Sequence, residues 1–181
     1  MKSRIFVIVC TVLLWSCAGV MDKESRAVFL DRTKPLSVTV YPVHVVISDK
    51  THSDTDLQKQ LVDHLNVLGY AEAIASEDDV EIPFIWGANQ AKMFRRSAEN
   101  FAAQLAGKPL STSYALLVET LSIQVEDNMG GVHYYIVDNQ GHVVDGALSN
   151  THWNAFTSVS PKNRQEGLQV AFNILKNLEL K

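Results

Sequence analysis

Cysteine is scarce in this sequence: two occur among 181 residues, Cys10 and Cys17, and both lie near the amino terminus. The rest of the chain therefore holds no disulfide and no cysteine ligand for a metal. Common catalytic patterns are missing as well, since the chain contains no HExxH, CxxC or G-x-S-x-G motif and no phosphate-binding glycine loop. A chain of this length without disulfides must be stabilised by its hydrophobic core.

Basic residues are outnumbered. The sequence has 16 Lys and Arg against 20 Asp and Glu, a formal charge of -4. Loss of an amino-terminal segment containing Lys2 and Arg4 would leave 14 basic against 20 acidic side chains, or -6. This balance gives no electrostatic reason to expect binding to nucleic acid or to anionic lipid.

Long apolar runs are also rare, and the clearest one spans residues 5–15. As a helix it would be about 16 Å long, against roughly 30 Å of hydrocarbon in a bilayer. A short apolar run that follows Lys2 and Arg4 is typical of a secretory signal rather than of a membrane span.

The tetrapeptide that ends this run at Cys17 resembles the bacterial lipobox. Leu14 and Ser16 match that motif, whereas Trp15 is larger than the residue usually found there. The resemblance implies cleavage after residue 16 and acylation of Cys17, with more than one acyl chain providing a durable anchor. Ordinary signal cleavage beside an incidental cysteine is the alternative.

The resemblance also implies a cellular location. Ala18 after the cysteine, in place of an aspartate, resembles the sorting pattern for the outer membrane, so we expect a protein anchored on its periplasmic face. We predict a lipoprotein signal peptide at 1–16, a lipidated amino terminus with a short tether at 17–36, and one domain at 37–181.

Hydrophobic alternation predicts the first strands of that domain. Residues 37–48 read as a strand, with Pro42 at a shift in the apolar pattern that indicates a bulge or a sheet edge. If it is an edge, the strand could pair with a second copy in a homo-oligomer. Residues 49–56 read as a polar loop and 70–75 as a short strand.

Three amphipathic helices are predicted. The first is capped by a residue among 53–55 and ends at Gly69, the second follows Asn89, and the third begins at Ser160 before a proline. Their apolar stripes are Leu57, Leu61, Leu65 and Leu68; Phe94, Ala98, Phe101 and Leu105; and Leu168, Ala171 or Phe172, Leu175 and Leu178.

Residues 114–125 read as a central strand, and 132–137 and 142–148 as a hairpin around a turn that ends at Gly141. The order of elements predicts a single α+β domain. We expect a mostly antiparallel sheet of about four to five strands packed against about three helices.

Four segments in this order, SVTVYP, LNVLGY, YALLVETLSI and YYIVDNQGHVVDGAL, resemble an envelope-lipoprotein domain. It is shared by the curli secretion channel, the lipoprotein activators of penicillin-binding proteins and the amino-terminal domain of TolB. The resemblance covers roughly Leu36 to Leu180 and implies a non-catalytic module for protein contacts and envelope assembly. The long hairpins of the channel and the long tether of the activators are missing here, so neither specific activity is implied.

The sequence contains six histidines, which are candidate metal ligands. His52 lies among aspartates in the predicted 49–56 loop, but a solvated loop that caps a helix explains the same residues. If Val137 pairs with His142 in the hairpin, His133 lies opposite Gly146, about 13 Å from His142 and too far for a shared zinc. We therefore expect no metal, no cofactor and no catalytic residue.

Three aromatic residues, Trp86, Trp153 and Phe156, are candidates for binding a partner, because aromatic side chains are enriched at interface hot spots. Burial beneath the loop at 151–156 is the alternative. The sequence thus favours a lipid-anchored, periplasm-facing module that binds another envelope protein. A metal-dependent periplasmic hydrolase and a carrier of a small apolar ligand are the other hypotheses.

Overall fold

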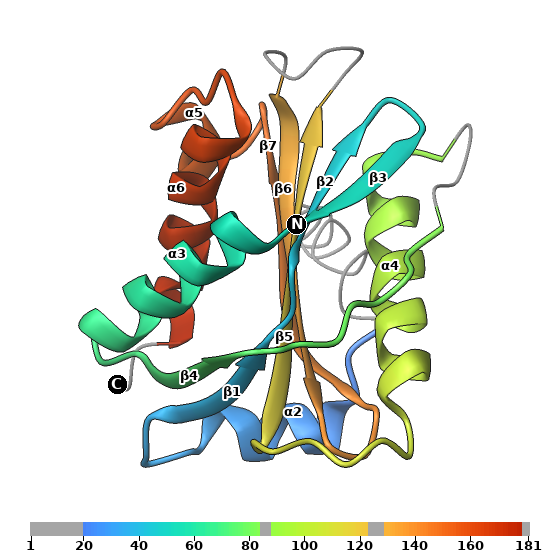
Figure 1. The fold of residues 1–181 in the computed structure, drawn as a ribbon, viewed down its shortest axis with the longest axis vertical. Helices are drawn as coiled ribbons and strands as arrows, with labels where there is room; N and C mark the ends of the chain where they lie inside the picture. The colour runs from blue at the N-terminus through green and yellow to red at the C-terminus, as the bar shows by residue number, and fades with distance from the viewer. Residues whose placement is uncertain (1–19, 84–87, 123–128, 179–181) are drawn as a thin grey trace, which may run out of the picture.

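A mixed β-sheet runs through the centre of the molecule, with helices on both of its faces (Figure 1). This computed structural model describes residues 20–83, 88–122 and 129–178. The strands are β1 (Leu36–Val40), β2 (Val43–Ile47), β3 (Lys50–Asp54), β4 (Ala71–Ala75), β5 (Tyr114–Ser122), β6 (Met129–Asp138) and β7 (Val143–Asn150). The helices are α2 (Lys23–Leu30), α3 (Thr55–Val67), α4 (Gln90–Leu105), α5 (Asn154–Thr157) and α6 (Arg164–Leu175), followed by the 3-10 turn η1 (Lys176–Leu178).

Strand β5 organises the sheet. One edge of β5 pairs antiparallel with β6 along its whole length. The other edge pairs in parallel with β1 and then with β2, which lie one after the other along it. Val40 lies opposite Leu116 and His44 opposite Glu119, so four steps in one strand match three in the other. The bulge predicted at Pro42 is confirmed by this extra residue.

The same pairing removes one reason to expect a homo-oligomer. Strand β1 also pairs with β4, and β2 also pairs with β3, so the bulged strand lies inside the sheet. Pro42 is tolerated by the bulge rather than by an open edge. Self-association through this strand therefore has no structural basis, and oligomerisation through another surface stays a prediction.

The α+β class is confirmed, but the predicted strand and helix counts were too low. The described residues form seven strands and five α-helices, and three of the six strand pairings are parallel. The expectation of a mostly antiparallel sheet was wrong. It assumed that strands consecutive in the sequence pair with each other, whereas β1 and β2 pair in parallel with β5, more than 60 residues further along the chain.

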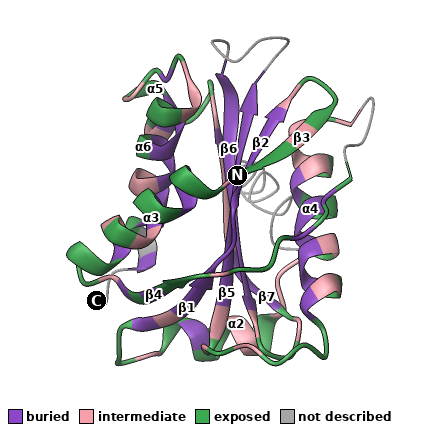
Figure 2. Cartoon of the chain, viewed as in Figure 1, coloured by how far each residue is buried: buried purple, intermediate pink, exposed green. Residues whose placement is uncertain are grey.

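The core has two parts, one on each face of the sheet. Helices α3 and α6 cover one face and α4 covers the other, and the central strands are buried throughout (Figure 2). The predicted stripes point inward, with Leu68 the exception at 45% exposure. Buried members are Leu57, Leu61 and Leu65 on α3, Phe94, Ala98, Phe101 and Leu105 on α4, and Leu168, Ala171, Leu175 and Leu178 near the carboxyl end.

Two helix starts and one helix end are as predicted. Asp54 caps α3 by accepting from the Leu57 N–H at 2.9 Å, and Asn89 caps α4 by accepting from the Lys92 N–H at 2.9 Å. Gly69 follows α3 with φ +70°, the left-handed conformation that glycine adopts without strain.

The last helix begins later than predicted. Asn163 caps it, by accepting from the Glu166 N–H at 3.0 Å, and Arg164 is its first residue. Ser160 cannot start it, because its φ of +51° is left-handed and turns the chain before Pro161. The residues before this turn form the short helix α5, which the sequence did not indicate.

The predicted polar loop at 49–56 is largely strand β3. It forms an antiparallel hairpin with β2 through a turn at Ser48 and Asp49, and Ser48 has a φ of +57°. Polar residues are tolerated because the strand lies at the edge of the sheet, where its side chains remain mostly exposed. Alternation of apolar residues therefore gives no signal there.

The hairpin formed by β6 and β7 has a different register from the predicted one. Val137 pairs with Val143, and an irregularity beside Ile136 moves His133 opposite Leu148. The Asp138 carboxylate accepts from the N–H groups of Gln140 and His142, which makes the turn longer than the pairing of Val137 with His142 would allow.

The predicted tether at 17–36 is folded over much of its described part. Helix α2 is capped by Asp22, and its Phe29 side chain is fully buried against the Tyr114 ring at a centroid distance of 5.3 Å. The Asp22 N–H also donates to the Val143 carbonyl at 3.0 Å. The chain is therefore attached to the sheet from about residue 20 onward.

Replacement of Phe29 by alanine tests this attachment. We expect Phe29→Ala to lower the free energy of unfolding by about 3–5 kcal/mol, because a buried ring leaves a cavity. Val28→Ala is the matched control, since Val28 is 69% exposed, and it should change stability by less than about 0.5 kcal/mol. Equal, small effects in denaturant titrations would show that α2 is not part of the folded body.

Candidate functional site

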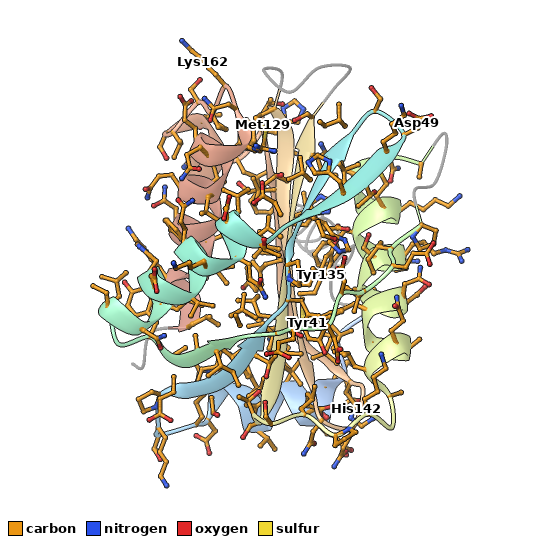
Figure 3. All side chains as sticks on the ribbon, viewed as in Figure 1. Tyr41, Asp49, Met129, Tyr135, His142 and Lys162 are labelled. Atoms are coloured by element: carbon orange, nitrogen blue, oxygen red, sulfur yellow. The ribbon has the colours of Figure 1, made fainter. Side chains whose placement is uncertain are left out.

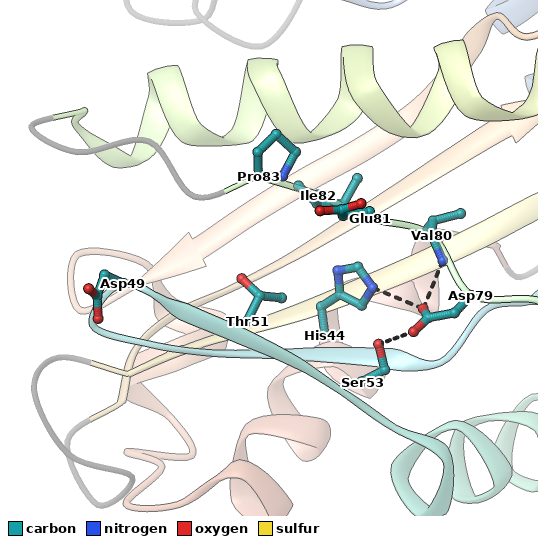
Figure 4. Close-up of a pocket in the computed structure, with 9 residues that line it drawn as sticks. All are labelled: His44, Asp49, Thr51, Ser53, Asp79, Val80, Glu81, Ile82 and Pro83. Carbon is teal, nitrogen blue, oxygen red and sulfur yellow. Dashed lines mark hydrogen bonds and ion pairs between the residues drawn. The ribbon is translucent and has the colours of Figure 1, made fainter.

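A polar cleft of about 440 Å³ opens between the β2–β3 hairpin and the extended segment 79–83, on the α4 face of the sheet (Figure 4). Its walls combine side chains from the hairpin with side chains from the segment that follows β4. The lining residues are His44, Asp49, Thr51, Ser53, Asp79, Val80, Glu81, Ile82 and Pro83.

The hairpin places its polar residues on one wall. His44 and Ser53 are directly opposite each other in the register, so their side chains emerge on the same face, and Thr51 lies two residues further along that face. His44 is fully buried, whereas Ser53 is exposed at the edge. One wall of the cleft is therefore set by strand pairing.

The opposite wall is held by burial and by one amide. Val80 and Ile82 insert into the core beneath α4, which leaves Glu81 between them exposed. The Gln104 side chain accepts from the Glu81 N–H at 3.0 Å and donates to the Glu81 carbonyl at 2.7 Å. An extended segment with two such backbone bonds is fixed much as if it were paired in a sheet.

Asp79 connects the two walls. Its carboxylate accepts from the Ser53 hydroxyl at 2.5 Å, from the Val80 N–H at 2.8 Å and from His44 Nε2 at 3.4 Å. Burial acts to raise the pKa of Asp79, but the hydrogen bonds from Ser53, Val80 and His44 outweigh it, so the pKa lies below its ordinary value. The carboxylate is thus ionised at neutral pH.

This order of groups differs from that of a serine hydrolase. A nucleophilic serine needs the imidazole between itself and the carboxylate, so that the imidazole can remove the hydroxyl proton. Here the carboxylate of Asp79 lies between Ser53 and His44, and the Ser53 hydroxyl donates to an anion. The contact orients the two walls and does not activate Ser53.

A row of buried ionisable side chains continues from the cleft into the sheet. His44, Glu119 and His133 are neighbours in the register across β2, β5 and β6, and all three are buried on the α4 face. The Tyr135 hydroxyl donates to Glu119 Oε2 at 2.5 Å, and His133 Nδ1 lies 3.0 Å from that hydroxyl and 3.5 Å from the carboxylate. Tyr135, labelled in Figure 3, lies at the middle of the sheet.

These contacts keep Glu119 charged inside the protein. Burial alone acts to raise the pKa of Glu119, yet the hydrogen bond and charge of His133 together with the Tyr135 hydrogen bond lower it below its ordinary value. A buried carboxylate without such donors would be neutral at physiological pH.

Two ring nitrogens of this row have no hydrogen-bond partner among the described residues: His44 Nδ1 and His133 Nε2. A second hollow of about 10 Å³ shares Thr51, Ile82 and Pro83 with the cleft and reaches Glu119. Asp79 contacts His44 Nε2, so Nδ1 is the ring nitrogen of His44 that has no partner among the described residues. A buried imidazole therefore lies beside the anionic groups of the cleft.

The electrostatic character of the cleft follows from its lining. Asp49, Asp79 and Glu81 supply three carboxylates, and no lysine or arginine lies among the lining residues. Within the described residues, no group of three or more His, Cys, Asp or Glu side chains has a geometry that could hold a metal ion. The arrangement is suited to an organic cation such as an ammonium or a guanidinium group.

The residues considered for a metal are dispersed. His52 pairs with Val45 and points to the sheet face opposite the cleft. Asp54 caps α3 and forms an ion pair with Arg164 at 3.4 Å, and only Asp49 lines the cleft. His142, which lies beside Asp138 at 3.2 Å in the β6–β7 turn, does not approach the buried His133.

The other predicted site residues do not form a cluster. Cys17 and Trp86 lie outside the described residues. Trp153 is 52% exposed beside α5, whereas Phe156 is buried in the core on the α3 and α6 face and offers no surface to a partner. Among these candidates, Trp153 alone is a described surface aromatic.

The row formed by His44, Glu119 and His133 was not predicted from the sequence. One signal was present, because Glu119 interrupts the apolar run YALLVETLSI. A carboxylate inside a strand buried on both faces needs donors from its neighbours. Which neighbours those are depends on the sheet order, which the sequence did not provide.

Comparison with known proteins adds little. No family model matches the chain, and no curated protein sequence matches it. Among solved structures, a PelC dodecamer from Paraburkholderia phytofirmans is similar with a TM-score of 0.38 and 11% identity, over 82% of this chain and 91% of that one. None of the helices in 20–83, 88–122 and 129–178 is long and apolar enough to cross a membrane.

Replacement of Glu119 by glutamine tests the buried row through its pH dependence. Because the folded pKa of Glu119 lies below the ordinary value of 4.5, its ionised form adds stability above that pH, and the contribution is lost as the pH falls further. We expect Glu119→Gln to cost about 2 kcal/mol at pH 7 and distinctly less at pH 3.

The control is Glu72→Gln, on an exposed position of β4, which should follow the wild type at every pH. Denaturant titrations from pH 3 to 7 measure these differences. A constant gap between wild type and Glu119→Gln across this range would mean that Glu119 is not stabilised as an anion.

Proposed function

We propose that this chain is a lipid-anchored, non-catalytic binding module of the bacterial envelope. Its cleft would receive a lysine or arginine side chain of a partner protein. The observation that carries the proposal is the cleft itself, which is lined by Asp49, Asp79, Glu81 and the buried His44, whose Nδ1 has no hydrogen-bond partner among the described residues.

Charge and geometry support a cationic ligand. The three carboxylates are exposed, so their attraction is screened by solvent and contributes to the association rate and to specificity more than to affinity. A hydrogen bond from the cationic ligand to His44 Nδ1, which has no partner among the described residues, would be stronger than one between neutral groups. The two walls are already held in place by Asp79, so little ordering is needed on binding.

The other two hypotheses receive less support. A metal-dependent hydrolase would need His52 together with the nearby aspartates, and these point in different directions. A carrier of an apolar ligand would need an apolar cavity, whereas this cleft is lined mainly by polar side chains. The resemblance to the curli-channel, synthase-activator and TolB domains stays part of the proposal through its general role in envelope assembly.

The anchor supplies the other half of the proposed function. Acyl chains on Cys17 would keep the domain at the periplasmic face of the outer membrane. Electrostatic attraction to anionic lipid would not hold the domain there, because its net charge is negative. A partner in the same compartment would then meet the cleft at a high local concentration.

Fractionation of cells tests the anchor. We expect Cys17→Ala to move the protein from the membrane fraction to the soluble periplasmic fraction, because the acylated sulfur is lost. Cys10→Ala is the matched control and should leave the protein in the membrane, since residue 10 would be removed with the signal peptide. Membrane retention of Cys17→Ala would contradict lipidation at that residue.

Crosslinking in cells tests the cleft. A photoreactive residue at Lys50, which is exposed at the hairpin, should give a crosslinked product that falls several-fold when Asp49 and Glu81 are both changed to lysine. Glu72→Lys reverses an exposed charge outside the cleft lining and should leave the product unchanged. Crosslinking that is insensitive to the charge reversal in the cleft would contradict cation binding there.

A further inference from the structure

We infer that the domain rests on the bilayer through one particular end, with its cleft directed away from the lipid. This end, the α2 end, consists of residues 22–34, the segment 106–113 and the turn 138–142. The inference rests on lipidation of Cys17 in the proposed function and adds the surface that contacts lipid, with Val28 and Leu30 at the membrane interface.

The length of chain between Cys17 and the folded body is the first reason. Val20 and Met21 pack against the core beneath α4, and the Asp22 N–H donates to the Val143 carbonyl at 3.0 Å. Three residues from Cys17 to Val20 span at most about 10 Å, so acyl chains on Cys17 must enter the bilayer close to the point where the chain joins the sheet.

The second reason is where that point lies. The Ser25 hydroxyl is 3.2 Å from His142 Nδ1, and Phe29 contacts Tyr114, so α2 covers the end of the sheet where β5 begins and the β6–β7 turn lies. His142 and Asp49 lie at opposite ends of the molecule in Figure 3. Five residues of β5 separate Tyr114 from Glu119 beside the cleft, which corresponds to about 17 Å along the strand.

The third reason is exposed apolar surface at this end. Val28 is 69% exposed and Leu30 is 54% exposed, on either side of the buried Phe29. Eight residues of α2 are too few to span a bilayer, but a helix lying along the interface can bury such side chains among lipid headgroups. An acyl anchor within about 10 Å of Val20 would bring lipid to this end of the domain.

Charge distinguishes this end from the rest of the domain. The α2 end carries five basic and four acidic side chains, a formal +1, so the rest of the chain after residue 16 carries -7. Anionic lipid headgroups repel an acidic surface and tolerate a weakly basic one. The orientation that brings α2 to the membrane therefore turns the carboxylates of the cleft away from it.

Site-specific labelling tests the inference. If Cys17 is acylated after cleavage, the mature chain has no reactive thiol, so Val28→Cys and Trp153→Cys each offer a single site for an environment-sensitive fluorophore. Trp153 is the matched control, because it is 52% exposed and follows β7 at the other end of the sheet. The full lipoprotein, purified from membranes, is reconstituted into vesicles that contain spin-labelled lipid.

We expect lipid quenching at position 28 to exceed that at position 153 at least threefold, with Leu30→Cys behaving like Val28→Cys. Equal or weaker quenching at positions 28 and 30 in protein that floats with the vesicles would overturn the orientation and leave the lipid anchor intact. Failure to float would instead refute the anchor. If the fluorophore at position 28 were shielded from solvent in lipid-free detergent, and the protein had twice its monomer mass in solution, this surface would bind a second copy of the chain. That result would also overturn the inference.

Discussion

The junction between the amino-terminal segment and the sheet is the constraint on which the rest of the structure depends. The Asp22 N–H bonded to the Val143 carbonyl, and the Phe29 ring buried beside Tyr114, join α2 to the end of the sheet. Burial of one such ring contributes about 1.5–3 kcal/mol, enough to hold a short helix that is too polar and too short to be stable alone. This junction converts what would be a flexible tether into a fixed connection.

A fixed connection would give a lipid-anchored domain one orientation relative to the membrane. With a long, mobile tether, every face of a lipoprotein can meet the membrane. Only two residues lie between Cys17 and Val20, so acyl chains on Cys17, as proposed, would fix the orientation of the domain and the position of its cleft together. The inferred orientation agrees with the proposed function, because it would leave the cleft accessible to proteins in the periplasm.

The buried row behind the cleft has a second structural role. A charged Glu119 inside the sheet is costly unless it is paired, and Tyr135 and His133 provide that pairing from the adjacent strand. A slip of β5 against β6 by one residue would separate these groups, so the row penalises wrong registers as well as stabilising the native one. The same register sets the position of His44, and through it the wall of the cleft.

Local patterns in the sequence predicted the elements that have a strong local cause. The stripes of α3 and α4, their caps at Asp54 and Asn89, and the bulge at Pro42 follow from periodicity, side-chain hydrogen bonds and the missing proline N–H. Strand β3 and helix α2 were missed, because edge residues are polar and because a single buried ring stabilises α2.

The candidate site could not be predicted from local sequence patterns, because its residues come from segments far apart in the chain. His44, Ser53 and Asp79 meet only after the hairpin forms and the segment after β4 crosses beside it. Glu119 is a charged residue within an apolar strand, but its hydrogen-bond partners could not be predicted, because they depend on which strands are neighbours in the sheet. Partner binding and burial were both open for Phe156, which lies in α5 and is buried in the core on the α3 and α6 face. Long-range pairing, which no local pattern specifies, decided each of these outcomes.

The intact mass of the protein extracted from membranes tests the central claim most directly. We predict a polypeptide that begins at Cys17 and carries the additional mass of acyl chains, located by fragmentation to that residue. A mass equal to that of the unmodified polypeptide, or a chain cleaved at another position, would contradict a domain held against the bilayer by its short amino-terminal connection.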